Sequence, residues 1–143
     1  MKKITLFSDG SALGNPGPGG YGVILRYADT EKELSGSYKY TTNNRMELQG
    51  VIEGLKALKE PCEVDVFSDS SYVVKGINEW IKGWIKKDFK KVKNPELWKE
   101  YLEVSKEHKI NAFWVRGHDG HEENERCDTL ARDAAQKMKD SLS

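Results

Sequence analysis

Residues 4–27 read ITLFSDGSALGNPGPGGYGVILRY. They contain two runs rich in apolar, β-branched and aromatic residues, 4–7 and 21–27, and such runs are typical of strands. Between them lies GNPGPGG, residues 14–20, whose density of glycine and proline favours a tight turn. We therefore predict an antiparallel pair of strands, which a third strand at 32–40 extends into a meander.

The rest of the chain alternates predicted helices and strands. A helix begins in the polar segment TTNN, residues 41–44, and runs to about Lys59, and Pro61 stops it. The further elements are a strand at 64–67, short helices at 72–78 and 79–86, a helix from Pro95, a strand at 110–115 and a helix at about 124–139. Strands joined by helices are normally parallel. The sequence thus predicts an α/β fold: a five-stranded mixed sheet, three antiparallel strands then two parallel, with helices on both faces.

Length and composition favour one domain, residues 1–143. No run is long and apolar enough to span a bilayer and the N-terminus lacks an apolar signal core, so we expect a cytoplasmic protein without a membrane partner. Cys62 and Cys127 stand far apart in the sequence and are expected to be reduced thiols. We expect a monomer, because no long unmatched apolar stripe is visible.

Charge is balanced overall but unevenly distributed. The chain has 23 basic and 23 acidic residues, and this neutrality argues against a nucleic-acid binder that depends on overall basicity. Residues 82–93, however, read KGWIKKDFKKVK, with six lysines and one acid. Acids gather instead at 29–33 and 121–125. A local basic surface is therefore available.

Four acids are placed where they could meet. Asp9 and Asp69 each follow a predicted strand, Glu47 lies in the first turn of the predicted helix after residue 44, and Asp128 lies in the first turns of the last helix. The carboxyl ends of parallel strands share one rim of a sheet. Carboxylates there suit Mg²⁺, and two such ions about 4 Å apart promote phosphodiester hydrolysis. Taken alone, an Asp after a strand is more often a turn or cap residue, and an acid at a helix start is common.

Four sequence blocks resemble the motifs of type 1 ribonucleases H. They are FSDGSALGNPGPGGYG (7–22), TTNNRMEL (41–48), FSDSSYV (67–73) and VRGHDGHEENERCDTLAR (115–132), in family order over nearly the whole chain. The resemblance implies the ribonuclease H fold and an endonuclease that hydrolyses the RNA strand of RNA–DNA hybrids. It further implies two Mg²⁺ ions, with Mn²⁺ as a possible substitute, and products with 5′-phosphate and 3′-hydroxyl ends.

The same resemblance implies roles for individual residues. Asp9, Glu47, Asp69 and Asp128 fall on the family's metal-site acids, and His118 falls on the loop histidine that assists proton transfer or product departure. A different interpretation takes His118, His121 and Cys127 as zinc ligands. It lacks a fourth ligand at a familiar spacing.

The implied substrate contacts divide between the two strands of a hybrid. Asn15, Asn43 and Asn44 are similar to residues that read the minor groove, although helix capping is an alternative role for Asn43 and Asn44. Residues 80–94 resemble a basic protrusion that grips the DNA strand. The further contacts implied on that strand are Thr42 and Asn94 at a phosphate pocket and Trp80 and Trp84 in the protrusion. Core packing is the alternative role for both tryptophans.

Three departures from the family pattern bear on affinity. The basic protrusion is a few residues shorter than in some bacterial relatives, and two single residues differ. Tyr40 stands where an arginine often supports the phosphate pocket, and Ser71 replaces a common amide. A second hypothesis is a module that binds hybrids without cutting them, and it predicts the loss of a metal-site acid. A third, a DNA-acting transposase or integrase relative, lacks the combination of TTNNRMEL with a basic protrusion.

Overall fold

The computed structural model describes residues 1–116 and 121–143 of the chain. The elements are β1 (Lys2–Ala12), β2 (Gly17–Tyr27), β3 (Thr30–Thr41), α1 (Asn43–Lys56), β4 (Cys62–Ser68), α2 (Ser71–Lys75), η1 (Gly76–Trp80), α3 (Ile81–Lys86), α4 (Pro95–Ser105), β5 (Lys109–Trp114) and α5 (Glu122–Ser141).

The five strands form one mixed sheet in the order β3-β2-β1-β4-β5. β1, β2 and β3 pair antiparallel, whereas β4 runs parallel to both β1 and β5. The predicted fold class is confirmed: a meander of three strands is extended by two parallel strands that follow helices.

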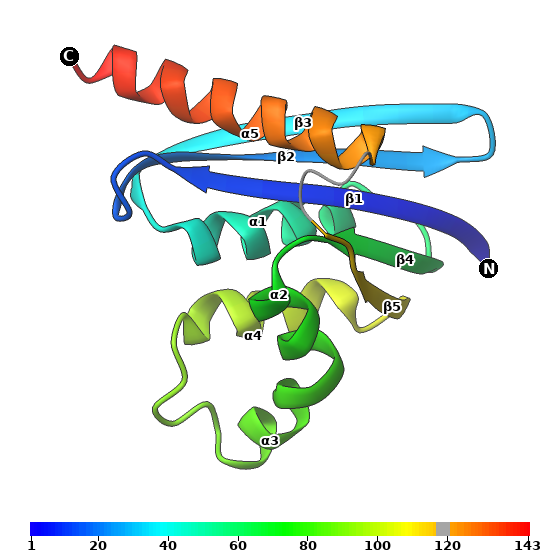
Figure 1. Cartoon of the computed structure of the whole chain (residues 1–143). Helices are drawn as coiled ribbons and strands as arrows, with labels where there is room; N and C mark the ends of the chain where they lie inside the picture. The colour runs from blue at the N-terminus through cyan, green and yellow to red at the C-terminus, as the bar shows by residue number, and fades with distance from the viewer. Residues whose placement is uncertain (117–120) are drawn as a thin grey trace.

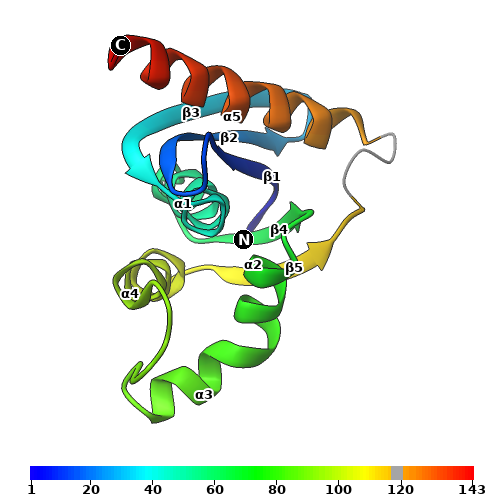
Figure 2. The ribbon, with the colours of Figure 1, turned by 60° about the vertical axis from the view of Figure 1, so that its left-hand side comes forward.

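Helices cover both faces of the sheet. Figure 1 shows α5 above β1, β2 and β3 and α1 on the opposite face, while α4 packs beside α1. The segment α2-η1-α3 leads away from the sheet, so that α3 and the turn after it form a protrusion far from α5 (Figures 1 and 2). This protrusion carries the lysine-rich stretch 82–93.

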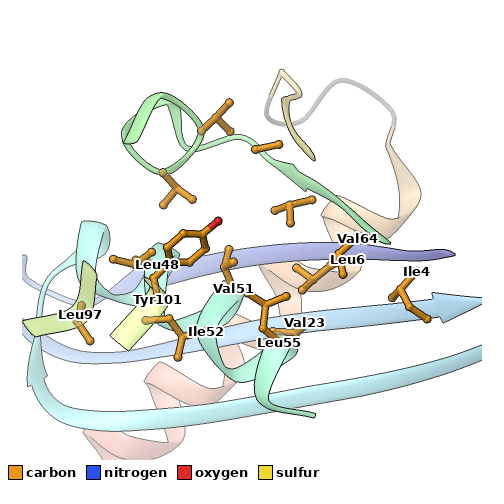
Figure 3. Close-up of a cluster of buried hydrophobic side chains, with 14 of the residues drawn as sticks. Ile4, Leu6, Val23, Leu48, Val51, Ile52, Leu55, Val64, Leu97 and Tyr101 are labelled. Carbon is orange, nitrogen blue, oxygen red and sulfur yellow. The ribbon is translucent and has the colours of Figure 1, made fainter. Parts of the chain in front are cut away.

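The larger part of the hydrophobic core lies between the sheet and α1. α1 contributes apolar residues at helical spacing, and the strands contribute alternate residues from their inner face. Each fully buried aliphatic side chain contributes about 1.5–3 kcal/mol to stability. The residues labelled in Figure 3 are Ile4, Leu6, Val23, Leu48, Val51, Ile52, Leu55, Val64, Leu97 and Tyr101.

Several boundaries differ from the prediction. β1 continues through Ala12, because its pairing with β2 extends into the glycine-rich segment as far as Ala12 opposite Gly19. α1 ends at Lys56 rather than near Lys59, since the Ala57 N–H bonds to the carbonyls of both Glu53 and Gly54 and tightens the last turn.

The two short helices predicted at 72–78 and 79–86 are one continuous helical segment. Its centre, η1, is a wider π-type turn that joins α2 to α3. Gly76 opens this turn, and a Cβ placed there would lie 2.3 Å from Cη2 of the fully buried Trp98. The close approach of helix and indole therefore requires a residue without a side chain.

No helix in the described part of the chain is long and apolar enough to cross a membrane. Cys62 and Cys127 are both buried free thiols, as predicted.

We predict that Gly76→Ala lowers the free energy of unfolding by about 1–3 kcal/mol, because the added methyl group overpacks the Trp98 site. Gly83→Ala is the matched control, since a Cβ at Gly83 meets no atom within 4 Å. In α3 this control is expected to be neutral or to stabilise by up to about 1 kcal/mol. Urea unfolding of both variants measures the difference, and equal midpoints would contradict the packing argument.

Candidate active site

Three carboxylates from separate elements converge at one rim of the sheet. Asp9 of β1, Glu47 of α1 and Asp69, directly after β4, each offer an oxygen, and these atoms lie within 4.8 Å of one another. Carboxylate oxygens in such a group match the ligands that Mg²⁺ prefers. The structure thus brings together three of the four predicted metal-site acids.

The strand register places Asp9 beside Asp69. The parallel pairing of β1 with β4 ends at Phe7 opposite Phe67, two residues before each aspartate. The prediction that Asp9 follows a strand was wrong, because β1 continues beyond it in its pairing with β2. Asp69 does follow its strand. Asp9 therefore lies just beyond the carboxyl end of the parallel pairing between β1 and β4. It still lies within the longer antiparallel pairing between β1 and β2.

Glu47 reaches the same rim from the second turn of α1. The predicted position in the first turn was wrong, since α1 begins at Asn43. The helix approaches β1 so closely that a Cβ at Gly10 would lie 2.4 Å from the Glu47 backbone nitrogen. The Gly10 N–H donates to Asp9 Oδ1 at 2.9 Å. Gly10 thus both admits the helix and orients one carboxylate.

Burial favours the uncharged form of two of the three acids, Asp9 and Glu47. Burial raises the pKa of Asp9 to about 7, and the charges of Asp69 and Asp128 act in the same direction. Burial and the neighbouring Asp9 raise the pKa of Glu47 well above its ordinary value. Glu47 Oε2 is buried and has no hydrogen-bond partner among the described residues. An unpartnered buried oxygen beside two more carboxylates fits a divalent cation.

Asp128 lies at the edge of this group. It is in the second turn of α5, and its charge raises the pKa of Asp9, so it is electrostatically coupled to the site. Its carboxylate forms an ion pair with Arg132, and the distance between Oδ2 and Nε is 3.0 Å. It is not part of the group defined by the three close oxygens. Asp128 is therefore a peripheral acid in this arrangement.

Of the two histidines with a predicted role, His118 and His121, the structure describes only His121. His118 lies outside the described residues. His121 is the exposed N-cap residue of α5 and its side chain makes no capping bond, whereas Cys127 is fully buried. Within the described ranges, the three acids are the one cluster able to hold a metal, so the zinc interpretation gains no support there.

A polar hollow of ≈ 480 Å³ gathers five of the predicted substrate residues. Its lining consists of Asn15, Thr42, Asn43, Asn44, Lys93 and Asn94. Lys93 is the one residue of this lining that was not predicted from the sequence, although it is the last lysine of the basic stretch. Neutral donors and one lysine around a hollow suit a phosphate group.

Side-chain hydrogen bonds hold one wall of the hollow. Thr42 is the N-cap of α1, and its Oγ1 accepts from the Arg45 N–H at 3.2 Å. Asn43 Oδ1 accepts from the Ala12 N–H at 2.7 Å, and Asn15 Oδ1 accepts from the Asn43 N–H at 2.9 Å. The alternative role of Asn43 as a helix cap is thus wrong: it ties α1 to the turn between β1 and β2.

A second network of hydrogen bonds holds Asn94 at the same hollow. Asn94 has a left-handed backbone, with φ 55°, and its Oδ1 accepts from Arg45 Nη1 at 3.1 Å. Asn94 Nδ2 donates to the Tyr72 hydroxyl at 3.1 Å, and Trp98 Nε1 donates to the same oxygen at 2.8 Å. Arg45 and Tyr72 were missed in the sequence, where nothing connects them with Asn94.

The two tryptophans of the protrusion differ in environment. The ring of Trp84 lies 5.0 Å from that of Trp98 in a T-shaped contact, so it packs against the core. Trp80 is 40% exposed and lies 5.9 Å from Trp84 between ring centroids. Trp80 is therefore the more exposed residue of this pair.

Comparisons with known proteins agree with this geometry. Residues 1–136 match the family described as RNase H. The chain is 67% identical to the ribonuclease H of Sulfurovum sp. (strain NBC37-1), over 99% of this chain and 96% of the relative. It is 62% identical to the ribonuclease HI of Campylobacter jejuni (strain ATCC 700819 / NCTC 11168), over 96% of this chain and 94% of the relative.

Two solved structures are similar in fold. LC9-RNase H1, described as a type 1 RNase H with the type 2 active-site motif, superimposes with a TM-score of 0.88 at 33% identity, covering 96% of this chain and 74% of that one. LC11-RNase H1, solved in complex with an RNA/DNA hybrid, gives a TM-score of 0.72 at 27% identity, covering 98% and 99%.

We predict that Asp9→Asn stabilises the protein in the presence of a chelator at about pH 8. Because the pKa of Asp9 is raised in the folded state, ionised Asp9 lowers the free energy of unfolding. This loss of stability is fully present above about pH 7 and disappears as the pH falls toward 4. Removing the charge should raise the free energy of unfolding by about 1–3 kcal/mol, because one pKa unit corresponds to about 1.4 kcal/mol.

Chemical denaturation at several pH values measures this gain, which should vanish near pH 4. The same substitution at the exposed Asp133 of α5 is the control and should change stability little at any pH. A pH-independent effect of Asp9→Asn would contradict the electrostatic explanation.

Proposed function

The chain belongs to the RNase H family of endoribonucleases, and we propose that it hydrolyses the RNA strand of RNA–DNA hybrids by a two-metal-ion mechanism that leaves 5′-phosphate and 3′-hydroxyl ends. The observation that carries the proposal is the convergence of Asp9, Glu47 and Asp69 within 4.8 Å. The hybrid bound to LC11-RNase H1 supports the substrate class.

In this proposal Asp9, Glu47, Asp69 and Asp128 hold the metal, with Mg²⁺ preferred and Mn²⁺ able to substitute. Two divalent ions, when bound, neutralise charge on the scissile phosphate and promote attack by water. Glu47 Oε2, which is buried and has no hydrogen-bond partner among the described residues, would be one of the atoms that hold an ion. His118 is proposed to assist proton transfer or product departure.

The polar hollow is the proposed contact surface for the hybrid. Asn15, Asn43 and Asn44 offer amide groups, which both donate and accept hydrogen bonds and therefore suit 2′-hydroxyl groups. Thr42 and Asn94, together with the Lys93 ammonium, suit a phosphate of the DNA strand. Trp80 and, to a smaller extent, Trp84 are proposed to contact the same strand from the protrusion at 80–94.

A hybrid-binding module that does not cut is the second candidate. It predicts the loss of a metal-site acid, whereas all four acids are present and three of them converge. We therefore favour the enzyme. We also infer that residues 1–143 act as one catalytic domain, in the cytoplasm and as a monomer.

We predict that the protein cleaves a labelled RNA strand annealed to DNA in Mg²⁺, and that Asp69→Asn lowers the rate at least about 100-fold, because it removes a metal ligand. Chelation should abolish cleavage, and an all-DNA duplex should stay intact. Product ends are identified by phosphatase sensitivity. If the folded protein binds the hybrid but never cuts it in Mg²⁺ or Mn²⁺, the binding module replaces the enzyme.

We predict that Lys93→Gln weakens hybrid binding and reduces the slope of log affinity against log salt by about 1, the value for one lost phosphate contact. Fluorescence anisotropy in the Asp69→Asn background, which prevents cleavage, measures both quantities. Lys137→Gln, at an exposed position of α5, is the matched control. Equal salt slopes for Lys93→Gln and Lys137→Gln would contradict a contact between Lys93 and a phosphate of the hybrid.

A further inference from the structure

Trp114, the last residue of β5, makes a polar contact with the backbone of a metal-site acid. Its indole Nε1 donates to the carbonyl oxygen of Asp69 at 3.0 Å. The side chain is 53% exposed, so core packing does not account for its position. A large aromatic ring thus lies half in solvent with its one polar atom directed at residue 69.

The Asp69 carbonyl lies outside the hydrogen-bond pattern of the helix that follows it. The first backbone N–H groups of a helix have no acceptor within the helix, and Val73 is the third residue of α2. The Val73 N–H instead donates to the Oγ of Ser70, the N-cap residue of α2, at 3.2 Å. The Val74 N–H bonds to the Ser70 carbonyl at 3.1 Å. The Asp69 carbonyl therefore precedes the helical pattern, and Trp114 satisfies it.

Hydrogen bonds connect the ends of β4 and β5 next to Asp69. Ser68 is paired with Trp114, and the Val115 N–H donates to the Ser68 carbonyl at 3.0 Å. The Ser70 N–H donates to Ser68 Oγ at 3.1 Å. Figure 2 shows β4 and β5 side by side, with α2 leaving the sheet below them. Asp69 is thus the link between a strand end and a helix start, and its own carbonyl is held from β5.

We propose that Trp114 is a positioning residue for the metal site: its indole N–H fixes the peptide group of Asp69 and thereby keeps the Asp69 carboxylate within reach of those of Asp9 and Glu47. Groups that orient metal ligands typically contribute a factor of about 10–100 to metal affinity or activity. The inference rests on the proposed function, because it concerns metal binding by the same acids.

The test compares Trp114→Phe, which keeps an aromatic ring but removes the donor, with Trp114→His. Neutral histidine with a protonated Nε2 carries an N–H at the ring position that corresponds to the indole nitrogen. At about pH 8 and well below the unfolding temperature of each variant, we expect the Mg²⁺ and Mn²⁺ concentrations for half-maximal cleavage to rise about 10-fold in Trp114→Phe. They should rise less in Trp114→His.

A second readout does not depend on activity. Binding of Mn²⁺ to the folded state raises the unfolding temperature, so the concentration dependence of this shift reports metal affinity. The shift should require about 10-fold more Mn²⁺ in Trp114→Phe. Phe113→Leu is the matched control, since Phe113 is the neighbouring exposed aromatic residue of β5. Its ring stacks on Phe67, and it has no N–H group to donate to Asp69.

The outcomes separate this inference from the proposed function. Unchanged metal dependence in both readouts for Trp114→Phe, with Asp69→Asn inactive, overturns the role of Trp114 and leaves the nuclease intact. An equal loss in Trp114→Phe, Trp114→His and Phe113→Leu also overturns it, because it reveals a general requirement for β5. Full cleavage by Asp69→Asn overturns the proposed metal site itself.

Discussion

The convergence of Asp9, Glu47 and Asp69 is the constraint that the architecture must meet. Ionised carboxylates whose oxygens lie within 4.8 Å repel one another, so this arrangement is costly. Burial adds to the cost, since it favours the uncharged form of both Asp9 and Glu47. The surrounding structure must therefore hold the acids together against their own electrostatics, and a bound cation would reduce this cost.

Three separate devices provide that restraint. The parallel pairing of β1 and β4 fixes the spacing of Asp9 and Asp69, and the absence of a side chain at Gly10 lets α1 bring Glu47 against β1. The apolar face of α1 then anchors the helix to the sheet through residues such as Leu48 and Val51. A stable core thus supports a locally unfavourable site, a combination common in functional sites.

Local sequence patterns predicted the fold class, because strands, helix caps and glycine-rich turns each depend on a short segment of sequence. They also placed Asp69 correctly after its strand. They did not reveal how far β1 extends, since that depends on pairing with β2 across a glycine-rich segment. The same limit applies to Trp114: its hydrogen bond to Asp69 joins residues 45 positions apart and leaves no periodic signal. The positions of the four acids in the predicted elements indicated that they could meet, and the resemblance added that they form one metal site. The structure brings Asp9, Glu47 and Asp69 together and leaves Asp128 at the edge of the group.

The position of the lysine-rich protrusion has a consequence for how the neutral chain meets a polyanion. Its six lysines lie on α3 and the turn after it, whereas Glu122, Glu123 and Glu125 begin α5 on the far side of the sheet (Figure 1). A molecule with zero net charge thereby carries a permanent dipole moment. Such a dipole orients the molecule during diffusional encounter with a polyanion, so that the basic end leads. Since the Debye length is about 8 Å at physiological ionic strength, this alignment acts only in the last approach.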